Sequence, residues 1–544
     1  MPRHDEAIRS RRPLIMGRRG AVATNHPMAT QAGLDVLRAG GNAVDAAVAT
    51  AAALGVVEPH MSGLGGDGFY HVFDGRSGAS TVFNATGAAP AAATAAHYRD
   101  VVGGIPNHGP LSISVPGSLA GLAAMHGAFG GRPWASLFGA AVELARDGFA
   151  ATRAYVHFAR ENRRRFADDA RSRAVFQDPA EGEGALGALV VQPDLARTLE
   201  TIAADGAEAF YRGRLGERIV AGVAAAGGLI SVADLGACRA ERQVAISVPY
   251  RGFEVRQTPP NSTGFTMLQM LRIVDRFDVA ALGYGSDALI HLLVEAKKRA
   301  FVDRERWGAD PRRRPIPLDR LLSAAHAAEA AASIDMERAA HLPVREHEMA
   351  GDTTYFCVID ADGNAVSAIQ SINSAFGSGV TAGDTGILMN NRMAYWHLED
   401  GHPNRLEPGM RVRHTMNAPL VLRDGRLWGV LGTPGADHQV QVNLQALVAM
   451  ADFGLDPQQA LEAPRWSSSQ PGQEANYPHG GEDVLTVERG IGADAIAGLE
   501  RRGHRVKVVP DLEGPCSVEA IRLLDNGIRM AASDPRRDGW AGAW

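Results

Sequence analysis

Apolar residues recur at helical spacing over several long stretches of the chain, and short glycine-containing breaks separate these stretches. Residues 29–39 are periodic, and Gly40-Gly41 ends the pattern. Asn42 is a suitable N-cap for a second helix over 43–54, because Asn side chains cap helix N-termini and Asp45 in the first turn favours the helix dipole. Further amphipathic helices are predicted over 117–149, 193–204, 215–226 and 286–302.

Other segments have the alternation or residue types of strands and loops. The glycine-rich segment 63–68 is predicted to be a tight turn that leads into a strand over 69–73. This segment matches GxGxxG, but a dinucleotide site requires a strand before the glycines and a helix after them, and here the order is reversed. Residues 250–257 form another strand candidate, which runs into the proline-containing loop 258–264. Residues 315–350 lack periodicity and are predicted to be a polar, partly exposed connector.

The clearest hairpin signal follows this connector. Two β-rich runs flank a turn of Asp, Gly and Asn residues at 360–364. If Ile359 pairs with Ala365, the register places Ser371 opposite Thr353, and Asn373 lies on the same face of its strand as Ser371. A bulge would shift this pairing by one residue. The pattern therefore predicts that two hydroxyl side chains face each other at the open end of the hairpin.

Composition narrows the class of protein. The chain has 544 residues, a formal net charge of −6, 45% hydrophobic and 21% charged residues, which is typical of a soluble globular protein. Nucleic acid and anionic membranes are not expected partners, because both require a concentrated basic face. The length allows three or four domains or one large α/β architecture.

Compartment and metal content can also be predicted. The N-terminal charges are not followed by an apolar segment that is typical of a secretory signal. The odd number of widely spaced cysteines, Cys238, Cys357 and Cys516, fits a reduced compartment, so we expect a cytoplasmic protein. The histidines lack zinc-like spacing, and neither a metal nor a cofactor is predicted.

Thr353 is placed where an N-terminal nucleophile would be. Cleavage of the bond between Asp352 and Thr353 would free an α-amine beside the Thr353 hydroxyl. Because such an amine has a pKa of about 8, one residue could supply both nucleophile and general base at neutral pH. The hydroxyl could also make the cut, by attack on the Asp352 carbonyl. On these residues alone, the simpler interpretation is favoured, in which Thr353 is only the first residue of a strand.

A set of motifs, in order along the chain, resembles the γ-glutamyltransferase family. The motifs are residues 40–47, 63–69, 352–354, 362–366, 373–379, 390–393 and 532–536. The resemblance implies an N-terminal nucleophile hydrolase fold, a four-layer αββα sandwich. It also implies a proenzyme that cleaves itself before Thr353 into a large subunit, residues 1–352, and a small subunit, residues 353–544. Together the two subunits would form one structural domain.

The resemblance also implies roles for individual residues. Thr353 would be the nucleophile, and Ser371 stands where the family has a threonine that contacts it. Asn373 matches a substrate-contacting asparagine. Residues 432–436 stand where the family has Ser-Pro-Gly-Gly, so the amides of Gly435 and Ala436 would form the oxyanion hole. Alanine in place of glycine keeps the N–H donor that this role needs.

The residues expected around the acyl group depart from the family's pattern. In γ-glutamyl-specific members an arginine holds the substrate α-carboxylate, and Thr86 occupies that position. Tyr395 replaces the acidic residue that reads the α-amino group, and Arg392 replaces a glutamine. His414-Thr415 replaces a Ser-Ser pair. Replacement of the arginine by threonine removes the guanidinium that would bind a carboxylate, so it must change how a carboxylate ligand binds.

These differences favour a self-cleaving amidohydrolase or acyltransferase that acts on a small-molecule amide with a non-γ-glutamyl acyl group. Arg392 and Arg413 are candidate anion holders, unless Arg392 points to solvent. Oxamate amidohydrolase and cephalosporin acylases are family relatives of this description. Two alternatives are a true γ-glutamyl hydrolase or transpeptidase with a relocated carboxylate clamp, and an unprocessed, non-catalytic binding relative. The acyl donor, the choice between hydrolysis and transfer, and dimerisation of the αβ units are left open.

Overall fold

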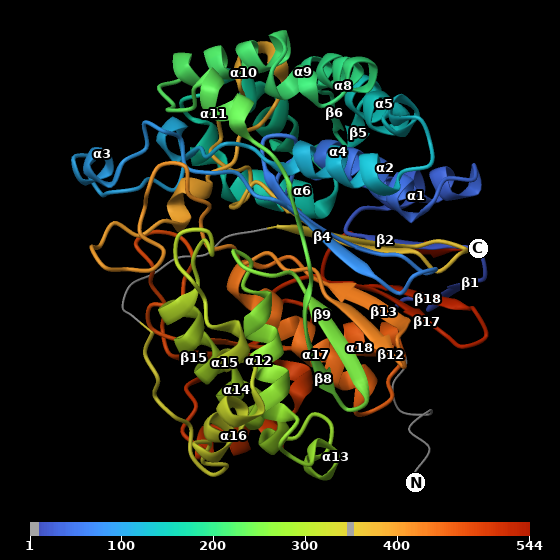
Figure 1. The fold of residues 1–544 in the computed structure, drawn as a ribbon, viewed down its shortest axis with the longest axis vertical. Helices are drawn as coiled ribbons and strands as arrows, with labels where there is room; N and C mark the ends of the chain where they lie inside the picture. The colour runs from blue at the N-terminus through green and yellow to red at the C-terminus, as the bar shows by residue number, and fades with distance from the viewer. Residues whose placement is uncertain (1–9, 345–352) are drawn as a thin grey trace.

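The computed structural model describes residues 10–344 and 353–544. Two seven-stranded antiparallel sheets are stacked between two layers of helices (Figure 1), which is the four-layer sandwich that was predicted. In order, the first sheet contains β19 (Trp540–Ala543), β2 (Ala21–Thr24), β10 (Thr354–Ile359), β11 (Ala365–Ser371), β3 (Asp67–Phe73), β4 (Ser80–Ala85) and β7 (Glu241–Gln243). The second contains β1 (Ile15–Gly17), β18 (Arg529–Ser533), β17 (Glu519–Leu523), β13 (Arg426–Gly432), β12 (Leu420–Arg423), β9 (Phe253–Gln257) and β8 (Ile246–Tyr250).

Both predicted subunit segments contribute to both sheets. In the first sheet, β10 and β11 from the C-terminal segment lie between β2 and β3 from the N-terminal segment. In the second sheet, β12 lies beside β9. The two segments therefore share both sheets.

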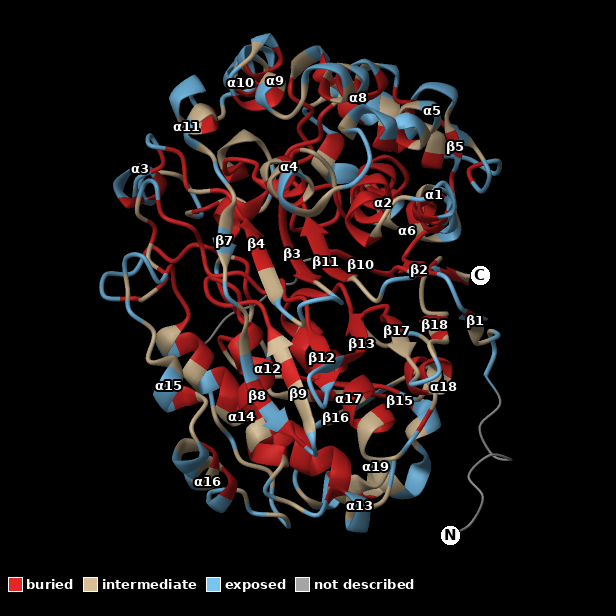
Figure 2. Ribbon diagram, turned by 45° about the vertical axis from the view of Figure 1, so that its right-hand side comes forward, coloured by how far each residue is buried: buried red, intermediate tan, exposed pale blue. Residues whose placement is uncertain are grey.

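Helices cover the outer face of each sheet. Over the first sheet lie α1 (Pro27–Arg38), α2 (Ala43–Val57), α4 (Ser118–Phe129), α5 (Gly139–Asp147), α6 (Arg153–Glu161), α8 (Pro193–Asp205) and α10 (Arg214–Ala225). Over the second lie α12 (Gly264–Val274), α14 (Asp287–Trp307), α17 (Gln439–Ala451), α18 (Pro457–Glu462) and α19 (Ala493–Arg501). Figure 2 shows buried residues concentrated in the sheets and in the helix faces turned toward them.

Strand alternation assigns side chains to different cores. Phe356 and Val358 of β10 pack in the cluster under the first helix layer, whereas Tyr355, Cys357 and Ile359 pack between the two sheets. Because both faces of β10 are covered, all its residues are buried. Odd-numbered residues of β10 thus face the space between the sheets.

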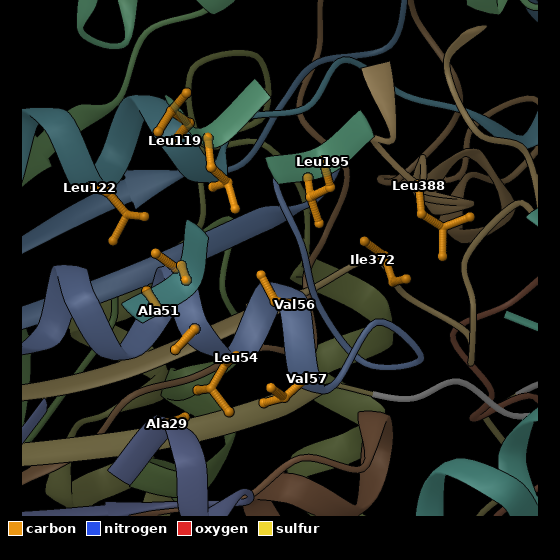
Figure 3. Packing of buried hydrophobic residues seen from close by; sticks show 14 of the residues in the cluster. Ala29, Ala51, Leu54, Val56, Val57, Leu119, Leu122, Leu195, Ile372 and Leu388 are labelled. Carbon is orange, nitrogen blue, oxygen red and sulfur yellow. The ribbon is translucent and has the colours of Figure 1, made fainter. Parts of the chain in front are cut away.

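The alanine-rich helix α2 is fully packed. Fourteen of its residues are buried, and Figure 3 shows Leu119 and Leu122 of α4 pointing toward it. Asn42 caps it, with its side chain accepting from the Val44 and Asp45 amides in a capping box, as predicted. Small side chains let neighbouring layers approach closely.

Two predictions were wrong. Residues 250–257 are not one strand, because Arg251 and Gly252 adopt positive φ values of 50° and 81° and turn β8 into β9. The described part of the predicted connector contains α15 (Leu318–Leu321) and α16 (Ala324–Ala332). The second of these is largely alanine, so it has no contrast of large apolar and polar residues that would reveal its period.

No helix in the described part of the chain is long and apolar enough to span a bilayer. The three cysteines are free thiols.

Candidate active site

The hairpin of β10 and β11 brings the two predicted hydroxyls together. Its register pairs Ile359 with Ala365 and Thr354 with Gln370, which confirms the predicted pairing. The Thr353 Oγ1 donates a hydrogen bond to Ser371 Oγ over 3.2 Å, and both side chains are buried. Ser371 Oγ also accepts from the Asn373 amide at 2.8 Å. The hydroxyl of Ser371 is thus fixed by its own strand and directed at Thr353.

A row of polar side chains continues from Thr353 across the first sheet. Asp67 of β3 is paired with Ser371, and the pairing of Gly68 with Ala85 places Thr86 next in the row. Residues paired in this way share a face of the sheet. Since neighbouring strands lie about 4.8 Å apart, the Asp67 backbone is about 10 Å from that of Thr353.

Asp67 is a residue of the site that the sequence did not reveal. The motif 63–69 predicts only that a strand follows a turn. The pairing of that strand with β11 joins segments far apart in the sequence, so local patterns do not predict it. The turn itself is fixed by close packing, because a Cβ on Gly66 would overlap the Ser371 carbonyl. Asp67 is fully buried, and its Oδ1 accepts from the Gly87 amide at 2.7 Å.

The predicted oxyanion turn follows β13 in the facing sheet. A Cβ on Gly432, the last residue of β13, would overlap the ring of Tyr355, so the end of β13 lies directly against the start of β10. Gly435 and Ala436 then have positive φ values of 116° and 46°. Backbone N–H groups in turns of this kind can form a concave anion-binding surface. The turn thus lies at the end of the sandwich where Thr353 leads into β10.

Arg392 lies inside the protein and does not point to solvent. It is 1% exposed, and its Nη1 donates to Asn373 Oδ1 at 3.1 Å. Its guanidinium carbon lies 4.4 Å from the centre of the Tyr395 ring, and the Tyr395 hydroxyl is 3.1 Å from Thr415 Oγ1. Four of the predicted binding positions therefore form one connected cluster.

Asp67 joins this cluster through His414. The Asp67 Oδ2 lies 3.4 Å from Arg392 Nε and 3.4 Å from His414 Nε2. Burial lowers the pKa of His414 to about 4, with a further contribution from the Arg392 charge. His414 is therefore neutral at pH 7, and the charges of Asp67 and Arg392 balance each other.

Thr86 carries no charge into the site. Its hydroxyl donates to Asn84 Oδ1 at 2.7 Å, and Asn84 Nδ2 donates to Asn261 Oδ1 at 2.8 Å. Asn261 comes from the loop 258–264 after β9, so this network connects the two sheets at the edge of the site.

Arg413, the other candidate anion holder, is 4% exposed and its Nη1 bonds Glu305 Oε2 at 2.7 Å. Although burial opposes ionisation of Glu305, the Arg413 charge and other cationic neighbours hold its pKa well below the usual value. Arg304 on the same helix turn bonds the carboxylate of Asp437, the residue after Ala436. The end of α14 therefore contacts both the 411–415 segment and the oxyanion turn.

Two groups of side chains in the described residues are close enough to hold a metal ion, namely His291 with Glu295 and His504, and Glu305 with His397 and His402. In the first, the facing nitrogens of the two imidazoles lie 2.8 Å apart and Glu295 bonds Lys298 and Arg299. In the second, Glu305 is bonded by Arg413 and His402. Hydrogen bonds and ion pairs thus engage the groups that would have to bind the metal.

Asp352, the other residue at the predicted cleavage point, lies outside the described residues. Of the remaining predicted site residues, the structure groups Thr353, Ser371, Asn373, Arg392, Tyr395, His414 and Thr415 around the start of β10. Thr86 continues the Thr353 row, and Gly435 and Ala436 lie at the end of the adjoining strand of the facing sheet.

The chain is similar to known proteins over nearly its whole length. The sequence profile described as Gamma-glutamyltranspeptidase matches residues 29–544. The "Glutathione hydrolase-like YwrD proenzyme" of Bacillus subtilis (strain 168) is 37% identical, over 97% of this chain and 99% of its own length. The "Acylase ACY 1 proenzyme" of Pseudomonas sp. (strain V22) is 38% identical, over 96% and 93%. The crystal structure of a cephalosporin acylase from Bacillus halodurans superposes with a TM-score of 0.90 at 33% identity, covering 99% of this chain and 98% of that one.

Proposed function

The chain belongs to the gamma-glutamyltranspeptidase family, and from this premise we propose that it is a self-cleaving N-terminal threonine amidohydrolase or acyltransferase whose substrate carries a non-γ-glutamyl acyl group. One observation supports the proposal above all others. Thr353 directly precedes the buried strand β10, and its hydroxyl bonds the fixed hydroxyl of Ser371. An N-terminal nucleophile needs a hydroxyl at such a position.

Maturation would begin with attack of Thr353 Oγ1 on the Asp352 carbonyl carbon. The peptide C–N bond breaks as the acyl group moves from nitrogen to oxygen, and water then hydrolyses the ester. The products are a large chain, residues 1–352, with a new carboxylate, and a small chain, residues 353–544, with a free α-amine on Thr353. Because each sheet contains strands from both chains, the chains would stay associated.

Turnover would use the same atoms. The α-amine takes the proton from Oγ1, which attacks the substrate amide carbon, and the amides of Gly435 and Ala436 stabilise the developing oxyanion. Loss of one such donor typically costs about 3–4 kcal/mol of transition-state stabilisation. The α-ammonium returns the proton to the leaving amine, and water or an acceptor amine then releases the acyl group from Thr353. Both hydrolysis and transfer follow from this chemistry.

The proposed substrate class follows from the charges in the site. No cation stands at the Thr86 position, and the Thr86 hydroxyl is bonded to Asn84. Asp67 balances Arg392, and Glu305 balances Arg413. A free α-carboxylate, which the γ-glutamyl group carries, would thus lack an uncompensated cation among these residues.

Denaturing electrophoresis and anilide hydrolysis test the proposal. The wild type should yield two chains, whereas Thr353→Ala should remain a single chain of 57.6 kDa without activity. Thr81→Ala, on a strand away from the hairpin's open end, is the matched control and should mature normally. Efficient turnover of γ-glutamyl-p-nitroanilide would favour the γ-glutamyl alternative. A single wild-type band that survives long incubation would favour a non-catalytic relative.

A further inference from the structure

A buried cluster of Asp67, Arg392 and His414 has more hydrogen-bonding capacity than the surrounding protein uses. Within the described part of the chain, Asp67 Oδ2, Arg392 Nε and His414 Nε2 meet only one another, over 3.4 Å, and have no hydrogen bond of ordinary length. Arg392 Nη2 and His414 Nδ1 have neither a hydrogen bond nor an ion-pair contact. The three side chains are at most 1% exposed. Buried polar atoms without partners are costly in a folded protein. Such a group of atoms is typical of a site that completes its hydrogen bonds with a ligand.

The cluster is placed to meet the acyl group of a substrate. Asp67 is in the same row of the first sheet as Thr353 and Ser371, and it points to the same face. Arg392 also bonds Asn373, whose amide is held by Ser371 Oγ. Because two strand spacings amount to about 10 Å, a chain of about three methylene groups joins an ester on Thr353 to this cluster.

The charges of the cluster discriminate between end groups. Asp67 and Arg392 cancel, and His414 is neutral because burial lowers its pKa to about 4. A second carboxylate would therefore lie beside Asp67 with no cation of its own, and burial of such a charge is unfavourable. An uncharged end group avoids this cost, because it brings no further charge into the cluster.

The hydrogen-bonding pattern selects among uncharged groups. The Arg392 Nη2 can only donate, and the Asp67 Oδ2 can only accept. A primary carboxamide has both an acceptor oxygen and a donor nitrogen, so it can satisfy both partners at once. A hydrocarbon end would leave Arg392 Nη2 and His414 Nδ1 without a partner.

We propose that Asp67, Arg392 and His414 form the specificity site for the distal end of the acyl group, and that they select an uncharged, carboxamide-like end over a carboxylate. The inference rests on the proposed function, since it assumes that an acyl group is bound to Thr353. It assigns to Asp67 a binding role that its position beside Ser371 makes possible.

Two p-nitroanilides of equal length test it, namely the glutaryl anilide and its 4-carbamoylbutanoyl analogue, which differ only in a carboxylate against a carboxamide. The wild-type enzyme should show a kcat/KM about tenfold or more higher for the carboxamide, as expected for one hydrogen bond to a charged group. Asp67→Asn, which leaves Arg392 uncompensated, should shift the ratio toward the carboxylate by about tenfold or more. Asp362→Asn, at an exposed position in the loop at the opposite end of the hairpin, is the control and should leave the ratio unchanged.

The possible failures can be told apart. A wild-type preference for the glutaryl anilide overturns the inference, as does an unchanged ratio in Asp67→Asn or cleavage of neither probe by enzyme that has processed itself. If Asp67→Asn does not fold, the wild-type ratio alone still decides. Failure of the wild type to self-process would instead refute the proposed function.

Discussion

Replacement of Arg304 by methionine should destabilise the protein strongly and disturb the oxyanion turn. Arg304 is 2% exposed and bonds the carboxylate of Asp437. Its guanidinium also lies 4.3 Å from the centre of the Phe301 ring. Methionine keeps much of the packing volume but leaves Asp437 buried without its cation. Removal of one partner of a buried ion pair typically costs about 3–5 kcal/mol, so we expect a loss of that size in the free energy of unfolding.

A double-mutant cycle in the uncleaved precursor measures this cost. In a Thr353→Ala background the chain should remain intact, so urea unfolding compares single chains. Arg304→Met should lower the transition midpoint markedly, whereas the double variant Arg304→Met with Asp437→Leu should recover most of the loss, because removal of both charges of a buried pair is often neutral. Arg306→Met, at an exposed position on the same helix, should stay within about 0.5 kcal/mol of the parent.

The same substitution should affect catalysis in the processed enzyme. Asp437 directly follows Ala436, so release of its ion pair loosens the turn that carries an oxyanion donor. We expect a decrease in kcat of up to about 10²- to 10³-fold, the range for loss of one such donor, with a smaller change in KM. The reasoning would be refuted if Arg304→Met unfolded at the parental midpoint, or if the double variant were less stable than Arg304→Met alone.

Three further predictions follow from individual contacts. Ser371→Ala removes the oxygen that faces the Thr353 hydroxyl, and the rate of precursor cleavage, followed by electrophoresis, should fall about tenfold; an unchanged rate would contradict this role. Gly432→Ala forces a Cβ against the Tyr355 ring and should lower the free energy of unfolding of the precursor by about 1–3 kcal/mol. An unchanged midpoint in urea unfolding would contradict this prediction. Burial lowers the pKa of both His71 and His414 to about 4. Because the unfolded chain protonates these residues near pH 6.5 and the folded chain only near pH 4, stability should be fully present above about pH 6.5 and fall as the pH decreases toward 4; a flat thermal midpoint across this range would argue against buried, neutral histidines.

Local patterns predicted the hairpin and the first two helices well. The register of β10 and β11 follows from a turn of Asp, Gly and Asn between β-rich runs, and this short-range signal was enough to place Ser371 opposite Thr353. Asn42 as a cap is likewise a local property of backbone and side chain. The turn at Arg251 was missed because only Arg251 and Gly252 separate β8 from β9. Strand-forming residues stand on both sides of this pair, so the sequence resembles one continuous strand.

The electrostatic character of the site could not be predicted from the sequence. Arg392 was identified as a candidate cation, but its balancing by Asp67 depends on which strand lies beside β11 and on where the 390–395 segment packs. Similarly, Arg413 looks like a free cation in the sequence, and only the position of α14 brings Glu305 to it. Charge balance in a buried site is a long-range property, because its members come from separate segments of the fold.

The N-terminal residue and mass of the small chain test the central claim most directly. We predict that purified wild-type protein separates into two chains under denaturing conditions, that sequencing of the smaller one begins at Thr353-Thr354-Tyr355, and that its intact mass equals that of residues 353–544. Thr353→Ala should give one uncut chain. An active wild-type protein that stays a single chain, or a small chain that begins at another residue, would contradict the assignment of Thr353 as the nucleophile.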